Sequence, residues 1–206
     1  PNGIDISQSP IPSFPREWHN PPIIGTMSRL VEEKALDVLL DALAIIDKRG
    51  IQFEVRIAGD GNKRKELEEQ INRLGLNNKV NMLGWVKDTD KFYNDIDIFC
   101  FPSRHEEFGL VLLEAYKNGL PAVVTNSDGP SDIVRDKING LIVPKDNAEA
   151  LAEALESLLL DKKKADVLAK GGYNTLINEY SIPVFGKNLS EALHLVIEAY
   201  KGKKTS

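Results

Sequence analysis

Two carboxylates flank a stretch that we predict to be the start of a helix. Glu106 stands just before Phe108, Gly109 and Leu110, and Glu114 lies one to two turns further along. The first N–H groups of a helix have no partner within it and carry partial positive charge, so a helix start favours an anion such as phosphate. Gly109 has no side chain, which lets a ligand approach the backbone closely. Carboxylates on either side can accept hydrogen bonds from hydroxyl groups.

This pattern has two interpretations. A phosphate at a helix start, flanked by carboxylates that bind hydroxyl groups, describes a nucleotide joined to a sugar. In the simpler interpretation, Glu106 and Glu107 only offset the partial charge of the helix start. His105 lies in the same loop, where we expect an exposed or supporting position rather than a role in proton transfer.

Two cations follow the first predicted strand. Arg29 and Lys34 come directly after the apolar run at residues 22–28. A pair of cations in such a place can clamp a diphosphate. They are interleaved with Glu32 and Glu33, so the alternative is an ordinary solvated surface.

Other loops and signatures narrow the choice. Trp85 and Val86 end the third predicted strand and can meet a nucleobase, although Trp85 alternatively covers the edge of the sheet. The turn GDGN at residues 59–62 resembles a phosphate turn, but no G-x-G-x-x-G follows the first strand, so the dinucleotide fingerprint is absent. The sequence has no P-loop, no G-x-S-x-G elbow and no Cys/His set with metal-binding spacing.

The elements that must position these residues alternate along the chain. Short apolar runs predict strands at residues 22–28, 53–59, 79–86, 96–102, 121–125 and 140–144. Helical patterns predict helices at residues 33–50, 63–74, 88–94, 109–119, 129–135, 147–160, 164–179 and 184–200. The alternation predicts a doubly wound, Rossmann-like parallel sheet of about six strands with helices on both faces. Ligands bind beyond the carboxyl ends of such strands, where the loops named above should meet.

Composition excludes several classes of protein. The chain has 206 residues, 42% of them hydrophobic, and a net charge of -5, so it does not have the basic surface of a nucleic-acid-binding protein. No apolar stretch approaches the ~20 residues that span a bilayer. The single cysteine, Cys100, lies in the apolar run IDIFCFP, and we interpret it as a buried structural thiol in a reducing, intracellular compartment.

The string EEFGLVLLEA, with seven residues between Glu106 and Glu114, resembles the E-x7-E motif of retaining glycosyltransferases with the GT-B fold. More narrowly it resembles their group 1, also called family 4. Further segments resemble that family in the same order: PNGID, SRLVEEK, IAGDG, VNMLGWV, NDIDIFCFPS, NGLPAVVT and NGLIVPKDNAEALAEAL. Ser28, Ala35 and Asp132 depart from it, because the family usually has Gly, Gly and Glu there. These departures leave the loop geometry and the sugar preference open.

The resemblance implies roles for the candidate residues. Arg29 and Lys34 would hold the donor diphosphate, and Glu106 would bind hydroxyl groups of the donor sugar near the reacting carbon; these three form the predicted catalytic set. Glu114 would bind the ribose. The remaining donor contacts would come from Phe108, Gly109 and Leu110 through their backbones and, at the base, from Gly84, Trp85 and Val86.

Family members have two Rossmann-like domains, and this chain resembles the second one. The resemblance therefore implies an interdomain linker at residues 1–20, a donor-binding domain at residues 21–181 and a C-terminal helix and tail at residues 182–206. An N-terminal domain would precede the chain and bind the acceptor, a sugar or a lipid-linked glycan. The helix near residues 184–200 resembles the terminal segment that packs back across the interface between the two domains.

The function implied is transfer of a hexose from a nucleotide diphosphate sugar, with UDP-sugars favoured, and this fragment alone is expected to be inactive. We expect no metal or other cofactor, because Arg29 and Lys34 would stabilise the diphosphate. The alternatives are a non-catalytic nucleotide-sugar-binding module and a GT-B nucleotide-sugar epimerase. We expect no nucleic-acid partner. The expected location is cytoplasmic, with peripheral association of the full-length protein at the inner face of the membrane as an alternative.

Overall fold

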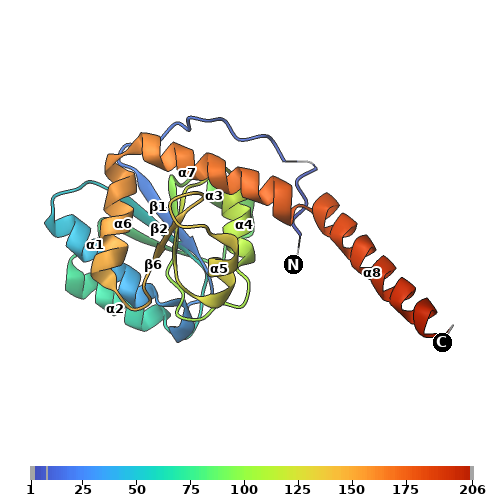
Figure 1. Cartoon of the computed structure of the whole chain (residues 1–206). Coiled ribbons are helices and arrows are strands. Elements are labelled where there is room, and N and C mark those ends of the chain that lie inside the picture. Colours follow the sequence, from blue (N-terminus) through green and yellow to red (C-terminus); the bar gives the residue numbers. More distant parts are fainter. Residues whose placement is uncertain (1–2, 8, 205–206) are drawn as a thin grey trace.

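The centre of the molecule is a parallel sheet of six strands. The computed structural model describes residues 3–7 and 9–204, so parts of the predicted linker and tail, at residues 1, 2, 8, 205 and 206, lie outside the described residues. The strands follow the order β3-β2-β1-β4-β5-β6 (Figure 1). They are β1 Ile23–Met27, β2 Glu54–Ala58, β3 Val80–Gly84, β4 Ile98–Phe101, β5 Ala122–Thr125 and β6 Leu141–Val143. The predicted doubly wound fold is confirmed.

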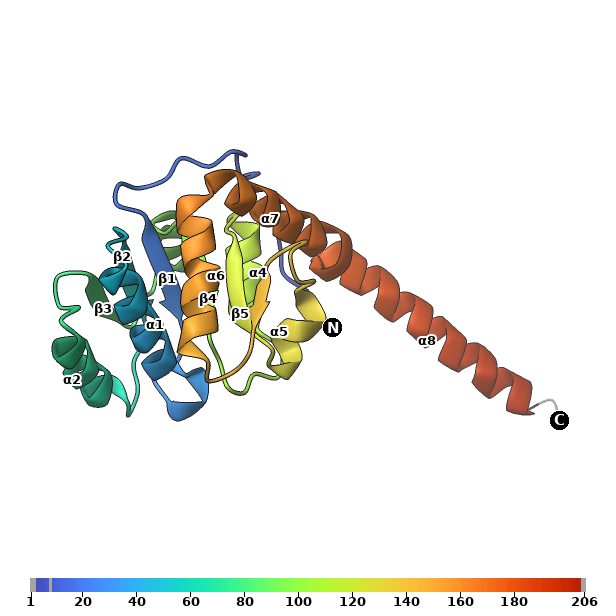
Figure 2. The same ribbon diagram turned by 60° about the vertical axis from the view of Figure 1, so that its left-hand side comes forward.

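Helices cover both faces of this sheet. They are α1 Leu36–Lys48, α2 Arg64–Leu74, α3 Thr89–Asn94, α4 Leu110–Lys117, α5 Asp128–Ile133, α6 Ala148–Leu160, α7 Lys162–Thr175 and α8 Ile182–Lys204. One core cluster joins α1, α2, α6 and α7 to one face, and a second joins α3, α4 and α5 to the other. Figure 2 shows α1 and α6 in front of the sheet.

The central strands are buried on both faces, as their continuous apolar sequences predict. All four residues of β4 are buried. Successive side chains of a strand point to opposite faces, so Ile98 and Cys100 enter the first cluster while Phe99 and Phe101 enter the second. Burial raises the pKa of the Cys100 thiol, which agrees with the predicted structural role.

Two predicted helices differ at their ends. The helix predicted from residue 33 begins at Leu36, because Glu32–Lys34 form a short 3-10 helix and Ala35 adopts a left-handed conformation with φ 50°. The helix predicted to end at residue 179 ends at Thr175 and continues as a π-helical turn, Leu176–Tyr180. Local periodicity does not distinguish one turn of these helices from an α-helix, because their hydrogen bonds span three or five residues instead of four and the resulting periods are too similar to separate over so short a segment.

The N-terminal segment is attached to the domain at several points. The Ile4 backbone donates to the Tyr180 carbonyl at 2.8 Å and accepts from the Ile182 N–H at 3.0 Å. Further along, the buried Asp97 carboxylate accepts from the N–H groups of His19 and Ile23. The segment is therefore attached at the start of α8 and, through Asp97, beside the starts of β1 and β4.

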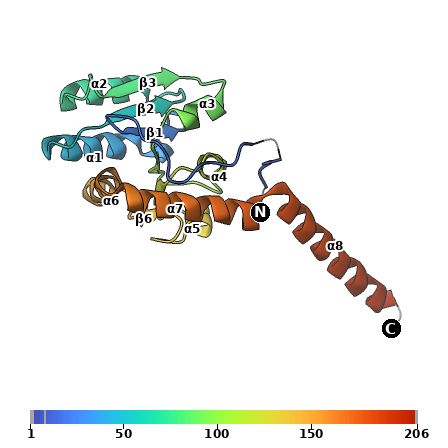
Figure 3. The ribbon, with the colours of Figure 1, turned by 90° about the horizontal axis from the view of Figure 1, so that it is seen from above.

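Helix α8 leaves the body of the molecule after Ser181 (Figures 2 and 3). Its side chains Ile182, Leu189, Leu193 and Leu195 are exposed. Among the described helices, none has both the length and the apolar character that crossing a bilayer requires. The predicted division into linker, domain and terminal helix stays a prediction.

Candidate functional site at the carboxyl edge of the sheet

One predicted cation, Lys34, and one predicted carboxylate, Glu106, meet where the strand order changes direction. Strand β1 pairs with β2 on one side and with β4 on the other, and all these pairs are parallel. The loop after β1 carries Arg29 and Lys34, and the loop after β4 carries Glu106. The crevice between two such neighbouring loops is the usual ligand site of open α/β sheets.

Lys34 and Glu106 are in direct contact. The Lys34 Nζ donates to Glu106 Oε2 at 2.6 Å, and the two side chains are only 14% and 19% exposed. The ammonium group also lies 5.7 Å from the centre of the Phe101 ring at the end of β4. An ion pair this sheltered is weakly screened by salt, and it places a cation and an oxygen acceptor within reach of one small ligand.

The start of α4 lies beside this pair. Gly109 is the N-cap of α4, with φ 94° and ψ 52°, and no described side chain caps the helix. An L-residue is strained in this conformation, so glycine is the natural choice. The Glu106 carbonyl accepts from Gly129 at 2.9 Å, which ties the loop to the start of α5. The helix thus offers uncapped N–H groups at the predicted phosphate position.

Glu114 is held by a buried phenol. The Tyr93 hydroxyl lies 2.9 Å from Glu114 Oε2 and 3.1 Å from the Val111 carbonyl oxygen. It has a single hydrogen, which we assign to the charged and nearer Glu114 carboxylate. Burial, and then the charge of Glu114, raise the pKa of Tyr93. The phenol therefore stays protonated and fixes one carboxylate oxygen of Glu114, which leaves the other oxygen for a ligand hydroxyl.

The remaining predicted residues have fewer contacts with the rest of the domain. Arg29 is exposed, and its side chain makes no hydrogen bond or ion pair with the described residues. Trp85 is 78% exposed, so the interpretation that it covers the sheet edge is wrong. Gly84 ends β3 with φ 70°. Leu110 is exposed and Phe108 half-buried, with its ring 6.2 Å from that of Tyr180.

Two supporting residues were missed by the sequence analysis. Tyr93 lies in the short helix α3, and nothing in its sequence context marks the hydroxyl group as a partner of Glu114. Arg104 immediately follows Ser103 in the β4–α4 loop and contacts residues of two other loops. Its position two residues before Glu106 was the only available signal. His105 is exposed, as expected.

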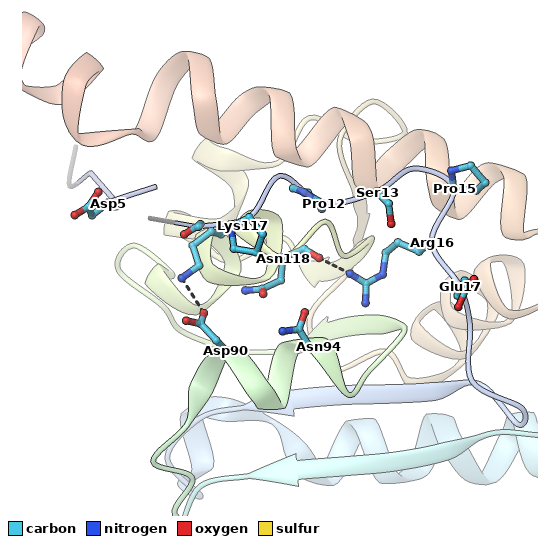
Figure 4. A pocket seen from close by; sticks show the side chains of 12 residues that line it. Asp5, Pro12, Ser13, Pro15, Arg16, Glu17, Asp90, Asn94, Lys117 and Asn118 are labelled. Carbon is cyan, nitrogen blue, oxygen red and sulfur yellow. Dashed lines mark hydrogen bonds and ion pairs between the residues drawn. The ribbon is translucent and has the colours of Figure 1, made fainter. Parts of the chain in front are cut away.

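A large cavity lies elsewhere. It has a volume of about 910 Å³ between Asp5, residues 9–17, α3 and the end of α4, and none of the predicted site residues lines it. Figure 4 shows Lys117 directed to Asp90, at 2.8 Å, and Arg16 directed to the Asn118 carbonyl. Because α4 returns from the carboxyl edge to the amino edge of the sheet, this cavity is at the opposite end of α4 from Gly109. Within the described ranges, no group of three or more His, Cys, Asp or Glu could hold a metal ion.

The fold and the loops define a Rossmann-like domain whose ligand edge carries paired charges and an uncapped helix start. The family described as "Glycosyl transferases group 1" matches residues 10–175, and the chain belongs to this family. It is 36% identical over 160 residues to the lipopolysaccharide core biosynthesis glycosyltransferase LpsE of Rhizobium meliloti (strain 1021), covering 78% of this chain and 46% of LpsE.

Solved structures extend the comparison. Anabaena Alr3699/HepE, crystallised with UDP, has a TM-score of 0.77 at 27% identity, covering 84% of this chain and 48% of that one. The C-terminal domain of the group 1 family protein LpcC from Francisella tularensis has a TM-score of 0.76 at 26% identity, covering 87% of this chain and 100% of that one. The chain thus spans about half the length of the curated relatives it matches.

Proposed function

We propose that this chain is the donor-binding half of a retaining glycosyltransferase of family 4, which transfers a hexose from a nucleotide diphosphate sugar to an acceptor. The observation that carries the proposal is the contact of Lys34 with Glu106 beside the uncapped helix start at Gly109. Glu114 lies on the same helix, oriented by Tyr93. The Anabaena protein, crystallised with UDP and with UDP-glucose, supports a uridine nucleotide as the donor.

In the proposed reaction, the bond between the sugar carbon and the diphosphate oxygen breaks and negative charge develops on the diphosphate. Lys34, Arg29 and the N–H groups of α4 stabilise that charge, which is electrostatic catalysis by preorganised donors. Glu106 accepts hydrogen bonds from the donor sugar and Glu114 from the ribose. We propose no metal in this step, because the protein cations neutralise the leaving group.

The Lys34–Glu106 pair has to open when the donor binds. Lys34 then exchanges the carboxylate for phosphate oxygens, and Glu106 exchanges the ammonium for sugar hydroxyl groups. Both groups are already desolvated, with 14% and 19% exposure, so neither gives up a full hydration shell. After the exchange the ammonium group is paired with phosphate and the carboxylate is hydrogen-bonded to hydroxyl groups, so both keep polar partners and the desolvation cost of binding is lowered.

The acceptor, a sugar or a lipid-linked glycan, would bind a preceding N-terminal domain, so this chain alone would bind the donor without turnover. The whole protein would act in the cytoplasm or peripherally at the inner face of the membrane. Trp85, Gly84 and Val86 would border the base, and the backbones of Phe108, Gly109 and Leu110 would contact sugar and phosphate.

A ligand panel tests the proposal. The melting temperature of the chain is measured with UDP, GDP, ADP, their glucose conjugates and, as a control, inorganic phosphate. A ligand that binds only the folded state raises the melting temperature with its concentration. We expect the largest rise with UDP or UDP-glucose and its loss in Glu114→Ala. Equal responses to every nucleotide and to phosphate, or none at all, would refute the proposal.

A further inference from the structure

Arg104 joins three loops at the ligand edge. Its Nη1 donates to the Glu32 carbonyl oxygen at 2.7 Å and to Asp37 Oδ1 at 2.9 Å, and its Nη2 donates to Asp37 Oδ2 at 2.7 Å. Its Nε donates to Asp146 Oδ1 at 2.6 Å. Arg104 follows β4, Glu32 and Asp37 follow β1, and Asp146 follows β6. We call these four residues the Arg104 network.

Backbone hydrogen bonds reinforce the connection. The N–H groups of Arg104 and His105 both point to the Glu33 carbonyl oxygen, at 2.8 and 3.3 Å. Lys34 is the next residue after Glu33, and Glu106 is the next after His105. The network therefore holds the two loops together one residue away from each partner of the Lys34–Glu106 pair.

Arg104 is not free to bind phosphate itself. A guanidinium has five N–H donors in a fixed planar fork, and four of them are used within the network. Burial is the largest single influence on Asp37 and acts to raise its pKa, but the hydrogen bonds and charge of Arg104, together with backbone N–H groups, jointly outweigh it and hold that pKa below its ordinary value. The Arg104 guanidinium is thus occupied by the carboxylates of the network.

We propose that Arg104 is a positioning residue of the donor site: by fixing the β1–α1 loop to the β4–α4 loop, it holds Lys34 and Glu106 at the separation that a nucleotide diphosphate sugar requires. This inference rests on the proposed function. Its physical reason is that misplacing a binding group by about 1 Å can weaken its action by as much as ~100-fold, whereas an exposed ion pair by itself contributes little.

The test compares variants of the full 206-residue chain. Dissociation constants for UDP are measured by calorimetry for Arg104→Ala, Arg104→Lys and Asp146→Asn. Arg49→Ala is the matched control, because Arg49 also binds two carboxylates of another element, Glu149 and Glu156, but lies away from the site. Circular dichroism and melting temperature report folding.

We expect Arg104→Ala to weaken UDP binding about tenfold, with Arg104→Lys close to it, because an ammonium group cannot form the planar fork. Asp146→Asn gives a smaller loss in the same direction and decides the question if Arg104→Ala fails to fold. Arg49→Ala leaves UDP binding unchanged. Wild-type affinity in Arg104→Lys would overturn the proposal, since charge rather than geometry would then suffice.

A double-mutant cycle separates positioning from general stability. If Arg104 acts through Lys34, Arg104→Ala costs little further affinity in a Lys34→Ala background, because the two effects are coupled. Full additivity of the two losses would overturn the proposal.

Hydrogen exchange of the ligand-free chain gives a readout that needs no nucleotide. We expect Arg104→Ala to speed exchange in residues 29–35 and 103–110, and Arg49→Ala to leave both segments unchanged. Unchanged exchange in Arg104→Ala would overturn the positioning role even if UDP binds. Faster exchange together with no nucleotide binding by the wild-type chain would support that role of Arg104 in holding the loops and refute the proposed function instead.

Discussion

A lysine–carboxylate pair lies near each end of α4, and the two pairs have different surroundings. At its start, Lys34 pairs with Glu106 at 2.6 Å, and at its end, Lys117 pairs with Asp90 at 2.8 Å. The lysines are similarly sheltered, with 14% and 17% exposure, but Glu106 is 19% exposed and Asp90 is 63% exposed. The first pair lies at the strand ends where the sheet changes direction, whereas the second borders the large cavity of Figure 4.

The cavity and the proposed site therefore lie at different ends of α4. The cavity of about 910 Å³ is lined by Asp5, by residues between 9 and 17 and by polar groups of α3 and α4, several of them already paired with one another. The carboxyl edge is open, yet it brings together groups from loops that are 72 residues apart in sequence, such as Lys34 and Glu106. In the proposed two-domain enzyme, the second domain would supply the opposite wall.

We expect the largest difference between the two ends of α4 in UDP affinity when each lysine is replaced by alanine. Lys34→Ala removes a charged donor and leaves Glu106 unpaired in a sheltered place, so we expect UDP affinity to fall by about 10- to 100-fold. Lys117→Ala should leave it unchanged, because Asp90 is exposed to water. Calorimetric titration of both variants is the measurement. Equal losses would show that the two ends of α4 are not distinguished by function.

Replacing the glycine at each end of α4 by alanine separates an effect on backbone strain from an effect on ligand binding. Gly109 and Gly119 have φ angles of 94° and 67°, so alanine is strained at both. We expect Gly109→Ala and Gly119→Ala each to lower the free energy of unfolding by about 1–2 kcal/mol. A Cβ at Gly119 would lie 2.7 Å from Pro12 Cβ, which adds to its cost. Urea unfolding measures both variants.

Only the first of these glycines should affect the ligand. Gly109→Ala is expected to weaken UDP binding as well, because the strained backbone shifts the helix start and the new methyl group contacts Phe101 at 3.4 Å and Glu106 at 3.9 Å. Gly119→Ala should bind UDP like the wild type. Weaker binding in both would attribute the loss to general destabilisation.

The two buried tyrosines of the second core cluster sharpen the comparison further. The Tyr93 hydroxyl donates to Glu114, whereas the buried Tyr116 hydroxyl has no partner among the described residues. Tyr93→Phe should cost about 1 kcal/mol of unfolding free energy and weaken UDP binding a few-fold. Tyr116→Phe should cost nothing in either measurement. A large loss in Tyr116→Phe would contradict the assigned hydrogen bonds.

The smallest expected effect is on acid stability. Since the pKa of Asp37 is lowered in the folded chain, this carboxylate stabilises the fold at neutral pH, and the contribution is lost as the pH falls below the unfolded value and through the folded pKa. Asp37→Asn should therefore lower the melting temperature at pH 7 and make it less sensitive to pH below about 4. Melting curves of the wild type and Asp37→Asn are measured from pH 7 to pH 2.5. A parallel loss of stability in the two proteins would contradict this prediction.

The sheet was predictable because its strands are buried and alternate with helices. Short apolar runs rich in β-branched and aromatic residues, such as IDIFCFP, favour strands covered on both faces, and parallel pairing then places every following loop at one edge. Lys34 and Glu106 could be assigned to that edge, but not to a 2.6 Å contact. Local sequence does not reveal the left-handed turn at Ala35, and the Arg104–Asp37 hydrogen bond joins residues far apart in sequence.

Other features had no local signal. The Tyr93 hydroxyl meets Glu114 only because α3 and α4 pack on the same face of the sheet. Trp85 illustrates the opposite case, since an aromatic residue after a strand normally predicts burial, yet this side chain is 78% exposed. Residue types and their order predict which chemical groups lie at the sheet edge. The orientation of each side chain depends on packing between segments that are distant in sequence.

The backbone bonds of Ile4 to Tyr180 and Ile182 have a mechanical consequence. They fix the N-terminal segment to the first residues of α8. A domain that preceded Gly3 and the projecting helix α8 would therefore be attached to the domain at the same place. Asp97, which accepts hydrogen bonds from the N–H groups of His19 and Ile23, fixes the other end of the same segment where the chain enters β1.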